Sequence, residues 1–195
     1  MGRFHGRQAL ERADPQILEK AQVMIGWKFK DLSLLALALL HKSCTDVWAC
    51  SNEPLEFIGD ALLDSTVDSY VSEKFPTLTT TEVNRMRGRL KSNRLLAIVA
   101  EEMDLSSVLS LNGWGIENFN QQKSRTKMMA DFFEAILGAL FIDGGREAME
   151  SFLARTLFLK AQEVFDDLDK SSLIETKFGK YLSPDSESSS ENDPS

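Results

Sequence analysis

The feature that most restricts the fold of this chain is the spacing of its apolar residues. They recur every three or four positions, as at Ile17, Leu18, Ala21 and Met24, and no stretch between turn signals alternates cleanly at every second residue. The first spacing gathers apolar side chains on one face of a helix, whereas strict alternation is typical of strands. The sequence therefore predicts an all-α fold and argues against a sheet.

Capping residues and helix breakers divide the chain into separate helices. Asp14-Pro15 is a typical helix start, and Gly26 and Pro76 are typical stop signals. Threonines 79 to 81 and Ser92 are good N-caps. The expected helices cover about 15–26, a segment after Asp31, 54–75, 80–90, 92–99, 126–144 and 149–164, and the polar segment 110–125 is expected to be a surface loop.

Length and composition favour one domain in a reducing compartment. The chain has 195 residues and two cysteines, and its longest apolar run, Leu34 to Leu40, is too short for a bilayer span. We therefore expect an intracellular protein without a membrane contact, in the cytoplasm or the nucleus. The expected parts are an extension over 1–14, a folded domain over 15–168, a connector over 169–182 and a disordered acidic, serine-rich tail over 183–195.

Two segments place acidic residues at helical spacing. Glu53, Glu56 and Asp60 are three and four residues apart, so a helix brings them near one face. Asp131 and Glu134 are three apart within a strongly apolar segment, where an unpaired carboxylate is costly. A divalent ion would offset that cost, and carboxylates without histidine or cysteine suit Mg²⁺ or Mn²⁺.

Glycines occur within both acidic segments. Gly59 and Gly138 each cost helix stability, so each is expected to mark the close approach of another backbone. From the pattern alone two interpretations stay open. The acids either form solvated faces or share a metal cleft between two helices.

The same residues resemble a known family. The segment Asn52-Glu53-Pro54-Leu55-Glu56-Phe57-Ile58-Gly59-Asp60 is similar to the signature helix of the ribonuclease III catalytic domain, and Ala130-Asp131-Phe132-Phe133-Glu134-Ala135 is similar to its second acidic helix. The resemblance covers roughly residues 15 to 168. Pro54 departs from the family pattern, which has arginine or another residue that is not proline there, and this departure is expected to leave Glu53 at the helix cap.

The resemblance implies a homodimeric endonuclease that hydrolyses double-stranded RNA with a metal-activated water and leaves staggered ends. By residue match, Glu56, Asp60, Asp131 and Glu134 would be the catalytic ligands of Mg²⁺, or of Mn²⁺ in its place. Glu53 would be an outer acid of the metal site. Phe57 would insert into the partner subunit at the dimer interface, the alternative being an ordinary core residue.

Basic residues supply candidate contacts to RNA phosphates. The full set is Lys42, Arg85, Arg87, Arg89, Lys91, Arg94, Lys123, Arg125 and Lys127, of which Arg85, Arg87, Lys91, Lys123 and Arg125 are favoured. The formal net charge of -8 argues at first against a nucleic-acid partner. Much of the negative charge lies in the tail and in the five site acids. The chain is therefore expected to bind RNA weakly, in a way that is sensitive to metal ions and to salt.

The double-stranded-RNA-binding domain that usually follows in this family is not apparent here. The alternatives are weak binding by a minimal enzyme, a helper protein that supplies RNA affinity, and a truncated chain. A rival function is a non-catalytic ribonuclease III-like module that binds or scaffolds RNA in a ribonucleoprotein complex. The presence of all five acids favours the enzyme, because a non-catalytic descendant would be free to lose them.

Overall fold

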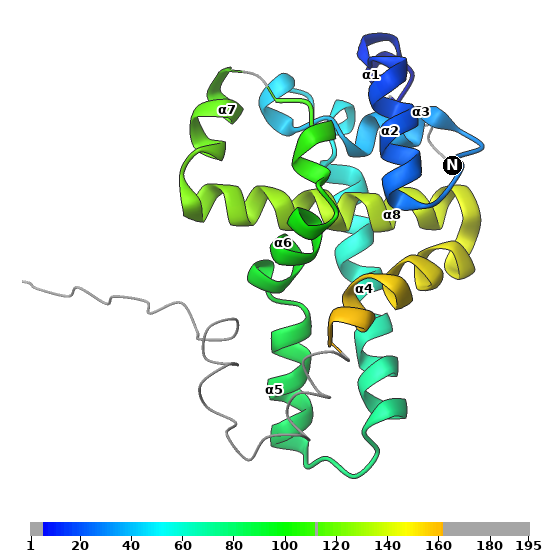
Figure 1. The fold of residues 1–195 in the computed structure, drawn as a ribbon, viewed down its shortest axis with the longest axis vertical. Helices are drawn as coiled ribbons and strands as arrows, with labels where there is room; N and C mark the ends of the chain where they lie inside the picture. The colour runs from blue at the N-terminus through cyan, green and yellow to red at the C-terminus, as the bar shows by residue number, and fades with distance from the viewer. Residues whose placement is uncertain (1–5, 112, 162–195) are drawn as a thin grey trace, which may run out of the picture.

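The fold is an assembly of α-helices, as the spacing of apolar residues predicts (Figure 1). A computed structural model describes residues 6–111 and 113–161. Within these ranges the only strand-like pairing is a parallel bridge between Leu40 and Ser110. The α-helices are α1 (Gly6–Arg12), α2 (Pro15–Ile25), α3 (Leu32–Ala38), α4 (Glu53–Lys74), α5 (Thr80–Leu90), α6 (Asn93–Glu102), α7 (Gly113–Phe119) and α8 (Gln122–Arg155), with short 3₁₀ turns η1 (Lys42–Cys44), η2 (Trp48–Cys50) and η3 (Leu105–Val108).

The predicted caps begin the helices where the sequence placed them. The Asp14 carboxylate accepts a hydrogen bond of 2.8 Å from the backbone N–H of Gln16, and Gly26 ends α2 in the left-handed conformation. Thr79 forms a capping box with Glu82 at the start of α5, and the Ser92 hydroxyl accepts from the N–H of Leu95. Local hydrogen bonding therefore accounts for these helix starts.

Helices α4 and α8 form the centre of the molecule. Figure 1 shows α8 running across the fold with α4 crossing it, and all thirteen residues from Met128 to Leu140 are buried. The two backbones meet at the predicted glycines. A Cβ atom on Gly59 would lie 1.8 Å from the carbonyl oxygen of Glu134, and one on Gly138 would lie 2.1 Å from that of Leu55. The prediction that these glycines mark close backbone contact is confirmed.

A bend at Gly145 divides α8, where φ is 75°. The sequence predicted a helix end at Gly144-Gly145 and a new helix after it, and the structure turns the chain at this point without a long loop. Asp143 fixes the bend, because its carboxylate accepts hydrogen bonds from the Trp27 indole and from the backbone N–H groups of Lys30 and Asp31. The bend thereby ties α8 to the connection between α2 and α3.

Some expectations need correction or lie outside the described residues. The loop expected over 110–125 is wrong, since α7 and the first turn of α8 occupy much of it. The segment expected as an extension contains α1, and Gly6 of this helix packs closely on Ser33. The predicted connector and tail lie outside the described residues. Among the residues described, no helix has the length and apolar character needed to cross a bilayer.

Candidate metal centre

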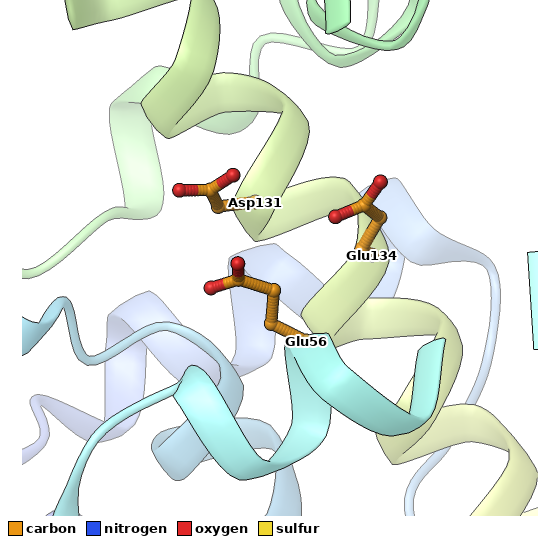
Figure 2. Close-up of side chains that lie close together, drawn as sticks. All are labelled: Glu56, Asp131 and Glu134. Carbon is orange, nitrogen blue, oxygen red and sulfur yellow. The ribbon is translucent and has the colours of Figure 1, made fainter. Parts of the chain in front are cut away.

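Three carboxylates converge beside the crossing of α4 and α8. Glu56 comes from α4, and Asp131 and Glu134 come from α8. One carboxylate oxygen of each lies within 4.8 Å of the others, and Figure 2 shows the three side chains directed toward a common space between the two helices. The structure therefore brings together acids that are about 75 residues apart in the sequence.

The glycine contact explains why these carboxylates meet. Gly59 lies one turn beyond Glu56, and its Cα faces the backbone of Glu134 at a distance that leaves no room for a side chain. Asp131 and Glu134 are three residues apart and so share one face of α8. Because the helix backbones touch at Gly59, the acid-bearing faces on either side of the contact are held within side-chain reach.

Burial and mutual repulsion disfavour the charged forms of this cluster. Asp131 and Glu134 are only 4% and 8% exposed. Burial, followed by the negative charges of Asp60, Asp131 and Glu56, raises the pKa of Glu134 to about 8. Burial also raises the pKa of Glu56 and that of Asp131. Three ionised carboxylates at this spacing therefore require a cation to be stable at neutral pH.

Lys127 supplies one positive charge to the cluster. Its Nζ donates hydrogen bonds to both carboxylate oxygens of Asp131, at 2.9 and 3.0 Å. Although burial opposes it, this interaction raises the pKa of Lys127. The sequence predicts Lys127 as a candidate phosphate contact and not as a partner of Asp131. The signal was present, because a lysine four residues before an aspartate shares its helix face.

The other two predicted metal-site acids do not join the three convergent carboxylates. Asp60 is exposed one turn beyond Glu56, and its charge, which raises the pKa of Glu134, places it at the edge of the cluster. Glu53 instead forms an ion pair of 3.5 Å with Lys42 and accepts a hydrogen bond from Ser51. Their roles as metal ligands stay predictions.

Several predicted RNA contacts are engaged in ion pairs within the chain. Arg87 binds both oxygens of Asp68, and Lys91 lies 2.5 Å from Asp64. These pairs connect α5 and its C-cap residue to α4, and Figure 1 shows α5 beside the part of α4 that lies away from its crossing with α8.

The remaining favoured cations lie near the start of α8 or on α5. Arg125 pairs with Glu101 at 2.9 Å and lies over the Phe119 ring. Arg85 on α5 and Lys123 on α8 are exposed. The contact of the five favoured cations with RNA stays a prediction.

Phe57 lies on the outer surface of α4. Its side chain is 74% exposed, whereas Leu55 on the same helix is fully buried. The alternative that Phe57 is an ordinary core residue is therefore wrong for the single chain. A large exposed aromatic side chain is typical of an interface, and its insertion into a partner subunit stays a prediction.

The chain is similar to known proteins of one family. A family model described as ribonuclease-III-like matches residues 31–161. A protein named Ribonuclease 3 from Nitratiruptor sp. is 31% identical over 157 residues, which are 80% of this chain and 66% of that protein. Ribonuclease 3 from Oleidesulfovibrio alaskensis is 39% identical over 135 residues, which are 68% of this chain and 58% of the relative. The chain thus spans about three fifths of the length of these relatives.

Solved structures show the same fold. The nuclease domain of ribonuclease III from Campylobacter jejuni is 31% identical, with a TM-score of 0.65 over 73% of this chain and 96% of that domain. That structure is described as flexible in a region involved in dimer formation. A Dicer from Giardia, at 24% identity and a TM-score of 0.57, covers 78% of this chain and shares the fold.

Proposed function

This chain belongs to the ribonuclease III-like family, and from that premise we propose that it hydrolyses double-stranded RNA with the help of divalent metal ions. The observation that carries the proposal is the convergence of Glu56, Asp131 and Glu134 between two helices. Buried carboxylates at this spacing are unfavourable on their own and have no evident structural purpose beside an apolar helix contact. They are well placed to hold cations that act on a phosphodiester.

The donor set fits Mg²⁺ or Mn²⁺. All three groups offer hard carboxylate oxygens, and neither cysteine is part of the cluster. Burial raises the pKa of all three carboxyls, so their ionised forms are unfavourable and would be stabilised by a bound cation. When bound, such an ion would supply Lewis-acid polarisation of the phosphate and acidify a water molecule.

The residues of this chain contribute binding, orientation and charge. Glu56, Asp131 and Glu134 would hold the ion, and Asp60 at the edge would extend the same acidic site toward the solvent. The rigid helix contact at Gly59 and Gly138 would keep these ligands from moving apart. Because no serine, cysteine or histidine in the cluster serves as a nucleophile, the chemistry that fits is direct hydrolysis by water.

Substrate and assembly follow from the family resemblance. Duplex RNA would be recognised by its A-form shape, phosphates and 2′-hydroxyls. In a homodimer formed through Phe57, each subunit would cut one strand and leave staggered ends. The exposure of Phe57 supports the dimer. A helper protein that supplies RNA affinity stays a prediction, motivated by the intrachain pairing of Arg87, Lys91 and Arg125.

The test is cleavage of a duplex RNA labelled on both strands, with purified protein in Mg²⁺ or in EDTA. We expect Mg²⁺-dependent products with staggered ends, and a loss of about a thousandfold or more in rate for Glu134→Gln, equivalent to about 4 kcal/mol. Asp60→Asn should also slow cleavage. Glu150→Gln is the matched control, because Glu150 is an exposed acid of α8 paired with Arg146.

Two results would contradict the proposal. One is cleavage that proceeds equally in EDTA or in Glu134→Gln. The other is binding of duplex RNA without cleavage in either Mg²⁺ or Mn²⁺, which would favour the alternative of a non-catalytic RNA-binding or scaffolding module. Sedimentation at micromolar protein tests the dimer separately, and Phe57→Ala should shift the protein toward a monomer.

A further inference from the structure

Lys127 reaches from the solvent into the carboxylate cluster. Its side chain is 58% exposed, whereas that of its partner Asp131 is 6% exposed. Both oxygens of Asp131 accept hydrogen bonds from the same ammonium group. One cation therefore engages the whole carboxylate of one of the three candidate metal ligands.

The positive charge of Lys127 acts on the entire cluster. Oxygens of Glu56 and Glu134 lie within 4.8 Å of an oxygen of Asp131, so the ammonium lies close to all three acids. The charge of Lys42 also acts on Asp131, but Lys42 forms its own ion pair with Glu53. Of the two lysines, Lys127 alone forms hydrogen bonds to a convergent carboxylate in the described part of the chain.

We propose that Lys127 is an intramolecular placeholder for the divalent ion, balancing the cluster without metal and leaving Asp131 when metal binds. This inference rests on the proposed metal-dependent function. An ammonium and a metal ion compete for the same oxygens of Asp131, and two cations at this distance repel each other. Metal affinity is therefore set by the exchange of one cation for another rather than by binding to bare carboxylates.

The placeholder has a second consequence, for stability. Without a counter-charge, the buried Asp131 would be costly to fold, since an unpaired buried charge destabilises strongly. With Lys127 in place, the helices can pack before metal is available. The wild-type protein should therefore depend little on metal for its folding, whereas a variant without the lysine should depend on it strongly.

The test measures Mn²⁺ affinity of the full chain by electron paramagnetic resonance of free Mn²⁺. Lys127→Met, which removes the charge and keeps the length, should bind Mn²⁺ about tenfold more tightly than wild type. Lys127→Arg should stay within about threefold of wild type because it keeps the charge. Lys28→Met is the control for net charge, since Lys28 is an exposed residue of the connection between α2 and α3. This variant should bind Mn²⁺ with the same affinity as wild type.

Thermal unfolding provides a readout other than metal affinity. In EDTA, Lys127→Met should melt several degrees below wild type, and excess Mn²⁺ should raise its midpoint by more than it raises that of wild type. If Lys127→Met does not fold, Lys127→Gln takes its place, with the same expectations. Equal or weaker Mn²⁺ binding by the folded neutral variant would overturn the placeholder.

The two proposals fail in different ways. If wild type does not bind Mn²⁺, or if Glu134→Gln binds it as well as wild type does, the proposed metal centre is wrong. The placeholder proposal is then wrong as well. If wild type binds Mn²⁺ through Glu134 but the neutral variants of Lys127 bind no more tightly, only the placeholder is wrong.

Discussion

Helix α4 makes two contacts of different kinds, one where it crosses α8 and one along α5. At the crossing, thirteen consecutive residues of α8 are buried and two glycines bring the backbones into contact. Along α5, Leu90 is the one fully buried side chain, and ion pairs join the helix to Asp64 and Asp68 of α4. The first contact is a close approach of two backbones, whereas the second combines partly buried apolar side chains such as Val83 and Met86 with partly exposed ion pairs.

This difference shows where the fold can support chemistry. Close packing holds side chains in fixed positions and excludes water, so carboxylates beside the crossing keep their spacing and feel one another strongly. Ion pairs at an exposed surface contribute little and adapt easily. The candidate metal centre lies beside the rigid contact. Substitutions on the exposed face of α5 should therefore cost less than substitutions at the crossing.

The largest expected effect comes from adding one methyl group at the crossing. Gly59→Ala would place Cβ 1.8 Å from the carbonyl oxygen of Glu134, and Gly138→Ala would place it 2.1 Å from that of Leu55. Backbone atoms cannot move far enough to make room, so each change should lower the free energy of unfolding by about 4 kcal/mol or more. Chemical unfolding measures the loss.

The matched control is Gly88→Ala on α5. A Cβ at Gly88 would meet no atom within 4 Å, and alanine favours a helix interior. This change should stabilise the protein by about 0.5–1 kcal/mol. Similar unfolding curves for the Gly59 and Gly88 variants would contradict the contrast between a packed crossing and a loosely held α5.

The second-largest expected effect is a loss of stability at acidic pH that involves His41. His41 is 2% exposed, and its Nδ1 accepts a hydrogen bond of 3.1 Å from the backbone N–H of Ser43. Burial, with the positive charge of Lys42, lowers the pKa of His41 from 6.5 to about 4. Folding therefore favours the neutral ring.

Because the pKa of His41 is lowered on folding, the free energy of unfolding falls as the pH falls. The stability that His41 contributes is fully present above pH 6.5 and is lost as the pH falls toward 4, for a total of about 3 kcal/mol. His41→Asn keeps an acceptor for the Ser43 N–H but does not titrate, so its unfolding free energy should fall less between pH 7 and 4. Urea unfolding at several pH values measures the difference, and parallel curves for the two proteins would count against this assignment.

The smallest effect is expected at the α4–α5 ion pairs. Lys91→Met removes the partner of Asp64 and should cost about 0.2–1 kcal/mol at low salt. Salt screens exposed charges, so the cost should shrink further in 1 M NaCl. Chemical unfolding at low salt and in 1 M NaCl measures the cost and its dependence on salt. A salt-independent cost above 2 kcal/mol would show that α5 is held more tightly than its exposure indicates.

Sequence reasoning succeeded where local interactions decide. The starts of α2, α5 and α6 follow from side chains that bind the backbone two or three residues later. It failed over 110–125, where polar residues suggested a loop. Helix α7 and the start of α8 occur there, and the Arg125 guanidinium lies over the Phe119 ring. An exposed helix can be polar over most of its surface, so composition alone does not separate it from a loop.

What the sequence by itself determined is the helical fold, the two acidic helices and the two glycines that permit a close backbone approach, because these depend on residue types and spacing within a few residues. Only the tertiary structure decided which acids converge. It joined Glu56 to Asp131 and Glu134, left Asp60 at the edge and paired Glu53 with Lys42. It also placed Lys127 on Asp131. The convergence of Glu56 with Asp131 and Glu134 depends on how two helices cross, which local spacing does not encode. The four-residue spacing of Lys127 and Asp131 permits their contact, but only the packed structure shows that Asp131 is buried and that Lys127 is its hydrogen-bond partner.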